Sequence, residues 1–185
     1  MKKVLFLASG SGSNVENIYE YFFQKRMNLD FQIVCNKKDA GIFDRAERLN
    51  LPINYFSKAD FTNGAFAEFV KNYNPDLIVL AGFLLMFPED VVQMFPNKII
   101  NVHPALLPKY GGKGMYGMNV HRAVLENEEP FTGITIHYVN EHYDEGEVIL
   151  QVQTDITTCA TAEEIAEKVH QLEYEHFPKV IHSLL

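Results

Sequence analysis

The chain has 185 residues, 47% of them hydrophobic and 22% charged, a length and composition typical of one well-buried domain. Its net charge of −8, with no block of Lys or Arg, argues against an extended nucleic-acid surface but is compatible with a small anionic ligand. Two cysteines, Cys35 and Cys159, are too few for a disulfide framework. MKK is followed by only five apolar residues, and no apolar run approaches the about 20 needed to span a bilayer. We therefore expect a reduced, cytoplasmic protein with neither a membrane nor a nucleic-acid partner.

Short apolar runs alternate with helical patterns through the first two thirds of the chain. The pattern predicts strands at 4–8, 31–35, 53–56, 76–83 and 98–103, and helices at 14–23, 40–49, 60–72 and 88–95. Strands that are apolar throughout and separated by helices indicate a parallel sheet covered on both faces.

In the last third of the chain, the continuous apolar runs give way to segments in which apolar and polar residues alternate. After a predicted helix at 118–127, two alternating segments, 133–139 and 148–156, are joined by the turn-rich HYDEGE and indicate an antiparallel pair added to the sheet. A closing helix begins at Thr161, which has capping-box spacing to Glu164, and Pro178 is expected to kink or end it. The fold class is therefore α/β: a single Rossmann-like, doubly wound, mostly parallel sheet with an antiparallel C-terminal strand pair and a closing helix.

The segment ASGSGSN (8–14) follows the first strand and resembles part of a dinucleotide fingerprint. Val15 occupies the place of the third glycine, and the second strand ends in CNKK with no acid at its tip. Two interpretations remain. Backbone N–H groups of Gly12, Ser13 and Asn14 could hold one phosphate monoester, or the glycines only make a tight turn with Asn14 as N-cap.

Asn101 and His103 lie two apart at the end of a predicted central strand, so their side chains share a face. Asp144 lies in the turn between the last two strands, which the proposed winding brings to the same edge. An amide, an imidazole and a carboxylate suit acyl-type transfer, because they can stabilise an oxyanion and move a proton. Each residue alone has a structural alternative as a backbone-satisfying, packed or turn residue.

The other histidines, His121, His137, His142, His170, His176 and His182, show no ligand spacing of the HExxH kind and no accompanying CxxC. No metal site is expected.

The motifs GSGSN, DLIVLAGF, NVHPALLPKY and GITIHYVNEHYDEGEVILQ, in this order, resemble the phosphoribosylglycinamide formyltransferase family over essentially the whole chain. The resemblance implies formyl transfer from 10-formyltetrahydrofolate to the amine of glycinamide ribonucleotide in purine synthesis. It implies one formyltransferase domain, 1–185, with a phosphate-binding half at about 1–100 and a catalytic, folate-binding half at about 76–185. Folate is then a co-substrate, no cofactor is tightly bound, the partners are small molecules, and the protein is a monomer or weak homodimer.

The resemblance also assigns site residues. Gly12, Ser13 and Asn14 match the phosphate cradle, Glu173 the acid near the substrate amine, and Asn101, His103 and Asp144 the catalytic residues, with His103 donating a proton and Asp144 raising its pKa. The folate site would comprise Lys58, Leu84, Leu85, Met86, Phe87, Val92, Asn101, Asn140, Glu141, His142, Tyr143 and Asp144.

Three departures from the family pattern stand out. Leu85 replaces a familiar basic residue, and the run Asp144-Glu145-Gly146 replaces one with two glycines. The segment 111–119 is longer than usual and adds Lys113, Met115 and Tyr116 beside the site. The sequence does not assign these additions a role.

Several rival functions are considered. A methionyl-tRNA formyltransferase would need an RNA-binding domain and a basic surface, and a formyltetrahydrofolate hydrolase a regulatory domain and a different loop. A formyltransferase acting on a nucleotide-linked sugar is harder to exclude. A non-catalytic nucleotide-binding module would leave Asn101, His103 and Asp144 without a role.

Overall fold

The computed structural model describes all residues, 1–185, and contains one sheet of seven strands in the order β3-β2-β1-β4-β5-β6-β7. The strands are β1 (Lys3–Ala8), β2 (Asp30–Cys35), β3 (Ile53–Tyr55), β4 (Leu77–Leu80), β5 (Ile99–His103), β6 (Phe131–Tyr138) and β7 (Val148–Asp155). Neighbours from β3 to β5 are parallel, whereas β6 is antiparallel to β5 and β7 is antiparallel to β6. The predicted mostly parallel sheet with an antiparallel C-terminal pair is confirmed.

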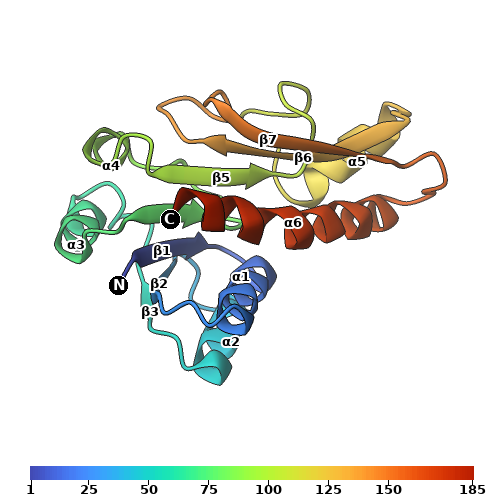
Figure 1. Ribbon diagram of the computed structural model, residues 1–185. Helices are drawn as coiled ribbons and strands as arrows, with labels where there is room; N and C mark the ends of the chain where they lie inside the picture. Colours follow the sequence, from blue (N-terminus) through green and yellow to red (C-terminus); the bar gives the residue numbers. More distant parts are fainter.

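Helices cover both faces of the sheet (Figure 1). They are α1 (Ser13–Gln24), α2 (Ile42–Leu49), α3 (Ala65–Tyr73), α4 (Glu89–Met94), α5 (Met118–Glu126) and α6 (Ala162–Leu184). Apolar residues of α1, α2, α5 and α6 form the larger core with one face, and those of α3 and α4 form a second core with the other. Alternate residues of β1 enter the two cores, which explains why its apolar run is continuous.

Two predicted elements are shorter than expected. The strand predicted at 76–83 ends at Leu80, because Gly82, with φ of 77°, turns the chain out of the sheet. The helix predicted at 60–72 begins at Ala65, because Gly64 adopts φ of 89° and ends a series of turns before it. In both cases a left-handed glycine sets the boundary.

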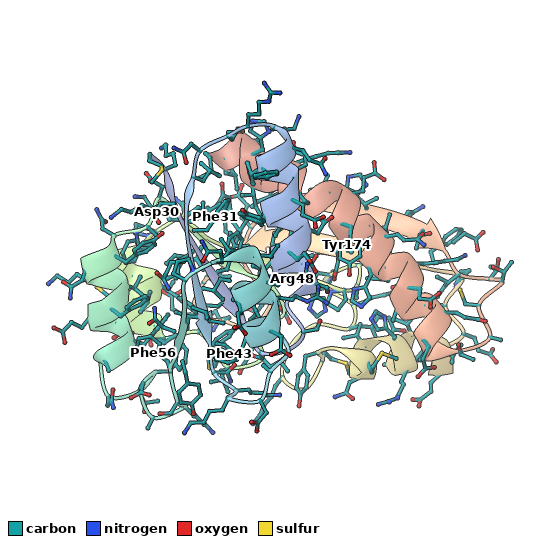
Figure 2. All side chains as sticks on the ribbon, turned by 90° about the horizontal axis from the view of Figure 1, so that it is seen from below. Asp30, Phe31, Phe43, Arg48, Phe56 and Tyr174 are labelled. Carbon is teal, nitrogen blue, oxygen red and sulfur yellow. The ribbon has the colours of Figure 1, made fainter.

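Of the two effects expected of Pro178, a kink or an end of the closing helix, the second is wrong, since α6 continues through it to Leu184. Proline has no N–H, so the carbonyl of Tyr174, four residues earlier, lacks its usual intrahelical donor. The side-chain amide of Asn17 on α1 donates to this carbonyl at 3.0 Å. Figure 2 shows α1 and α6 side by side, with Tyr174 on α6. The contact between the helices therefore helps the last turns to form beyond Pro178.

No helix of the protein has both the length and the apolar character that crossing a bilayer requires.

Gly133 in β6 fits only because it lacks a side chain. A Cβ there would lie 2.8 Å from Leu106 Cδ2 and 2.9 Å from Gln153 Cα on β7. We expect Gly133→Ala to lower the free energy of unfolding by about 1–3 kcal/mol, because the backbone of β7 must shift. Urea denaturation followed by circular dichroism measures this. Gly41→Ala is the control, since its Cβ would meet nothing closer than Ser11 Cα at 3.6 Å. Equal midpoints for the two variants would contradict the interpretation.

Candidate active site

A cavity of about 630 Å³ opens at the carboxyl ends of β1, β4 and β5. Its walls come from the loop after β1, the loop after β4, the end of β5, the segment before α5, the turn between β6 and β7, and one face of α6. The order of the strands reverses between β1 and β4, and ligands of doubly wound sheets bind at such a point. The predicted site segments therefore meet around one cavity.

The loop after β1 brings free N–H groups to the cavity. Gly12 has φ of 75°, and a Cβ on it would lie 2.6 Å from Ile42 Cγ1, so this position requires glycine. The first-turn N–H groups of α1, which begins at Ser13, have no carbonyl partner within the helix. Gly12, Ser13 and Asn14 all line the cavity. Asn14 lies inside the helix, and Gly12 occupies the N-cap position, so the alternative with Asn14 as N-cap does not describe the structure.

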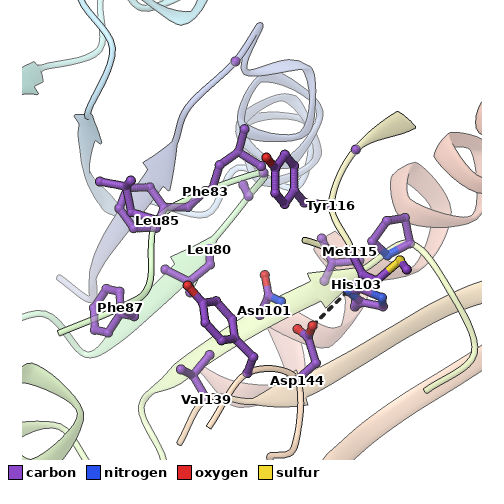
Figure 3. Close-up of a pocket in the computed structure, with 18 of the residues that line it drawn as sticks. Leu80, Phe83, Leu85, Phe87, Asn101, His103, Met115, Tyr116, Val139 and Asp144 are labelled. Carbon is purple, nitrogen blue, oxygen red and sulfur yellow. Dashed lines mark ion pairs between the residues drawn. The ribbon is translucent and has the colours of Figure 1, made fainter. Parts of the chain in front are cut away.

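Asn101, His103 and Asp144 come together at one end of the cavity, as predicted (Figure 3). Asp144 Oδ2 lies 3.6 Å from His103 Nδ1 and accepts a hydrogen bond of 2.9 Å from the Gly112 N–H. His103 is 3% exposed, so its interaction with Asp144 is poorly screened by solvent. An acid and an imidazole are thus held where a reacting group can meet both.

The tautomer of His103 follows from its partners. Its Nε2 lies 2.8 Å from the carbonyl of Tyr110, which can only accept, so Nε2 carries a proton and Nδ1, facing Asp144, is the atom that titrates. Burial lowers the pKa of His103 below its ordinary value. The charge of Asp144 acts in the opposite direction and raises this pKa, which is the effect expected from the sequence, but it is the smaller of the two. Because the loss of solvation outweighs the attraction to Asp144, His103 is neutral at neutral pH.

Burial raises the pKa of Asp144, but the neighbouring His137 and His103 and the Gly112 N–H outweigh it and hold this pKa below the usual range. The carboxylate is therefore ionised at neutral pH. Asp144 and Tyr110 both adopt left-handed backbone conformations, with φ of 55° and 57°. Such residues are uncommon outside glycine and cluster at functional sites, and these two are the partners of His103.

Asn101 is oriented by its neighbour across the sheet. The antiparallel register pairs Asn101 with His137, and Asn101 Nδ2 donates to His137 Nε2 at 3.2 Å. His137 Nδ1 donates to the Tyr138 carbonyl at 2.8 Å, so the ring is held with Nε2 toward the amide. This contact fixes which end of the Asn101 amide turns toward the strand.

Glu173 joins the closing helix to the loop after β1. It is 4% exposed, and its Oε2 accepts from Asn14 Nδ2 at 2.8 Å and from His170 Nδ1 at 3.0 Å. The hydrogen bond to Glu173 raises the pKa of His170. Burial, reinforced by the charge of His170, lowers the pKa of the adjacent His121 to about 4. Glu173 Oε1 has no protein partner and is available to a ligand.

The predicted folate residues divide into two groups. Those of the loop after β4 and of the turn between β6 and β7 line the cavity: Leu84, Leu85, Met86, Phe87, Asn140, Glu141, His142 and Tyr143. Ser9 Oγ accepts the Leu84 N–H at 3.0 Å and so fixes the first of these loops to the loop after β1. Val92 packs in the smaller core and Lys58 is exposed outside the cavity lining.

Three histidines of the cavity wall, His121, His137 and His170, were not predicted as site residues. His170 precedes Glu173 by three residues on one helix, a spacing that places both on one face and that the sequence showed. His137 and His121 depended on strand register and on helix packing, which the sequence did not show. No group of three or more His, Cys, Asp or Glu side chains is arranged to hold a metal ion.

The model of the family described as "Formyl transferase" matches residues 2–181. The chain belongs to the formyl transferase family.

Within this family, the chain is similar to proteins named phosphoribosylglycinamide formyltransferase. It is 37% identical over 190 residues to the chloroplastic protein of Arabidopsis thaliana, covering 99% of this chain and 65% of that protein. It is 34% identical to the Bacillus subtilis protein, covering 100% of this chain and 95% of that one. The crystal structure of glycinamide ribonucleotide transformylase 1 from Geobacillus kaustophilus superimposes with a TM-score of 0.89 at 31% identity, covering 100% and 99% of the two chains. The chain thus spans just under two thirds of the plant relative and nearly the whole of these two bacterial proteins.

Because the charge of Asp144 raises the pKa of His103, we expect Asp144→Asn to lower that pKa further. Histidine NMR titration from pH 4 to pH 8 measures it directly. Asp155→Asn, at the end of β7 outside the cavity, is the control and should leave the His103 titration unchanged. An unchanged or raised His103 pKa in Asp144→Asn would show that the pair is not coupled.

Proposed function

We propose that the protein transfers the formyl group of 10-formyltetrahydrofolate to the amine of phosphoribosylglycinamide in purine biosynthesis. The observation that carries this proposal is the position of Asn101, His103 and Asp144 in one cavity with the N–H groups that follow β1. Membership of the formyl transferase family and the names of the relatives support the same reaction.

In this proposal the two substrates contact different walls of the cavity. The phosphate binds the N–H groups of Gly12, Ser13 and Asn14, and Glu173 Oε1 lies toward the amine-bearing part of the ribonucleotide. Folate binds between the loop 84–87 and the turn 140–144. The first 100 residues thus supply the phosphate site, and residues from about 76 onward supply folate binding and catalysis. Lys58 and Val92 lie outside the cavity lining and have no direct contact with folate in this proposal.

The reaction needs an oxyanion stabilised and a proton moved. The substrate amine attacks the formyl carbon, the carbonyl oxygen becomes an oxyanion, and the bond from that carbon to the folate nitrogen then breaks. The amide N–H of Asn101 that does not face His137 can donate to the oxyanion. Over the whole reaction one proton leaves the amine and one reaches the folate nitrogen, so the products balance.

His103 is suited to carry that proton. In its neutral form, Nδ1 has a free lone pair and can accept the proton that the attacking amine loses. The resulting imidazolium faces the carboxylate of Asp144, which stabilises it. In the second half of the proposed reaction it donates the proton to the departing folate nitrogen. The reduced pKa of His103 favours this return, because a weakly basic imidazole gives up its proton readily.

We further propose that folate serves as a co-substrate with no resident cofactor, and that the protein works in the cytoplasm as a monomer or weak homodimer.

His103→Ala and Asp144→Ala should each lower turnover by roughly 100- to 1,000-fold, since each removes a preorganised charge or proton carrier. Release of tetrahydrofolate from 10-formyltetrahydrofolate in the presence of phosphoribosylglycinamide measures the rate. His176→Ala on α6, outside the cavity lining, is the control. Folded variants with near-normal turnover would contradict the assignment.

The same assay separates the rival functions. Folate release without the ribonucleotide would indicate a hydrolase, and release with an amino-sugar nucleotide would indicate the sugar-directed alternative. Binding of phosphate ligands without any folate turnover would indicate a non-catalytic module.

A further inference from the structure

The cavity contains one permanent cation. Among its lining residues, Lys113 is the only Lys or Arg, whereas Glu141, Asp144 and Glu173 contribute three carboxyl groups. A wall of this composition repels an anion unless a cation is placed to compensate. The proposed substrates are nevertheless anionic, with a phosphate on one and carboxylates on the other.

The backbone on either side of Lys113 is held by hydrogen bonds. Gly112 and Gly114, on either side of it, have φ of 90° and 91°. The Gly112 N–H is bonded to Asp144, and Asn119 Nδ2 donates to the Gly114 carbonyl at 3.2 Å. Figure 3 shows Met115 and Tyr116 of the same segment on the cavity wall. The backbone around Lys113 is therefore fixed to Asp144 on one side and to the start of α5 on the other.

The Lys113 side chain itself is free. It is exposed and has no ion pair or hydrogen bond in the structure. In contrast, Lys109, four residues earlier, is paired with Glu129 at 2.8 Å. An unpaired ammonium on a flexible four-carbon stem can reach a ligand without breaking an existing contact.

The loop that offers N–H groups to phosphate has no Lys or Arg of its own that lines the cavity. Arg45, the basic residue that contacts it, donates to the Ser11 carbonyl and is paired with Glu16. Lys37 and Lys38 line an adjoining depression outside the active-site cavity. Loops that cradle phosphate commonly add a lysine to their N–H groups, because the N–H dipoles alone leave a dianion partly uncompensated.

We propose that Lys113 is a substrate-binding residue that neutralises the phosphate of the ribonucleotide held at Gly12–Asn14. A phosphate monoester carries nearly two charges at neutral pH, whereas each folate carboxylate carries one, so the phosphate gains more from a single cation in the cavity. The inference rests on the proposed function and adds to it the residue that compensates the acidic wall.

The test compares Lys113→Met with the wild-type protein on phosphoribosylglycinamide and on its dephosphorylated riboside. We expect KM for the phosphorylated substrate to rise about tenfold or more, because a charge-assisted contact is lost, with kcat changed less than threefold. For the riboside, kcat/KM should be the same in both proteins. Lys113→Arg should retain most of the affinity, and Lys71→Met, an exposed lysine on α3 outside the cavity, should behave as wild type.

Calorimetry with ribose 5-phosphate repeats the comparison without turnover, so a failure of the proposed reaction is distinguishable from a failure of this inference. Wild-type turnover decides the reaction, and the ratio between variant and wild type decides the role of Lys113. An equal loss on the riboside, a rise in KM for folate instead, or a full effect in Lys37→Met with none in Lys113→Met would each overturn the inference.

Discussion

The antiparallel pairing of β5 with β6 is the constraint on which the site depends. Its register sets Asn101 opposite His137 and His103 opposite Thr135, so polar side chains of both strands share one face at the carboxyl end of the sheet. The turn that follows β6 then returns toward β5 and brings Asp144 to the His103 imidazole. A shift of one residue in this pairing would turn Asn101 and His103 away from His137 and Asp144.

Two opposing effects determine the chemistry at His103. Burial disfavours the imidazolium and the Asp144 carboxylate favours it, and in the free protein burial is the stronger. The Tyr110 carbonyl fixes the proton on Nε2, which leaves Nδ1 as the atom that exchanges protons. In the proposed reaction, a group in this balance is neutral at rest and becomes charged when it accepts the proton of the attacking amine. Such behaviour is what a residue that both accepts and returns a proton requires.

The two ends of the chain meet at the proposed phosphate site. Asn14, at the start of α1, is bonded to Glu173 in the middle of α6, and Asn17 donates to the carbonyl that Pro178 leaves without a partner. The closing helix therefore does more than cover the core, since it carries one wall of the cavity and fixes the side chain of Asn14. The segment 112–117 also lines the cavity and is joined to Asp144 through the Gly112 N–H.

The sequence by itself determined the element types, the sheet class, the place of Asn101 and His103 on the strand that becomes β5, and the place of Asp144 in the turn after β6. Periodicity and turn chemistry, which carry this information, are local properties of the chain. It did not show that α6 continues beyond Pro178, since the donor that replaces the missing N–H comes from Asn17, far away in sequence. Only the tertiary structure decided that His137 orients Asn101, that burial outweighs Asp144 at His103, and that Lys113 is the one permanent cation of the cavity. These properties arise from strand register, solvent exclusion and the meeting of distant loops, and none of them is encoded in any single segment.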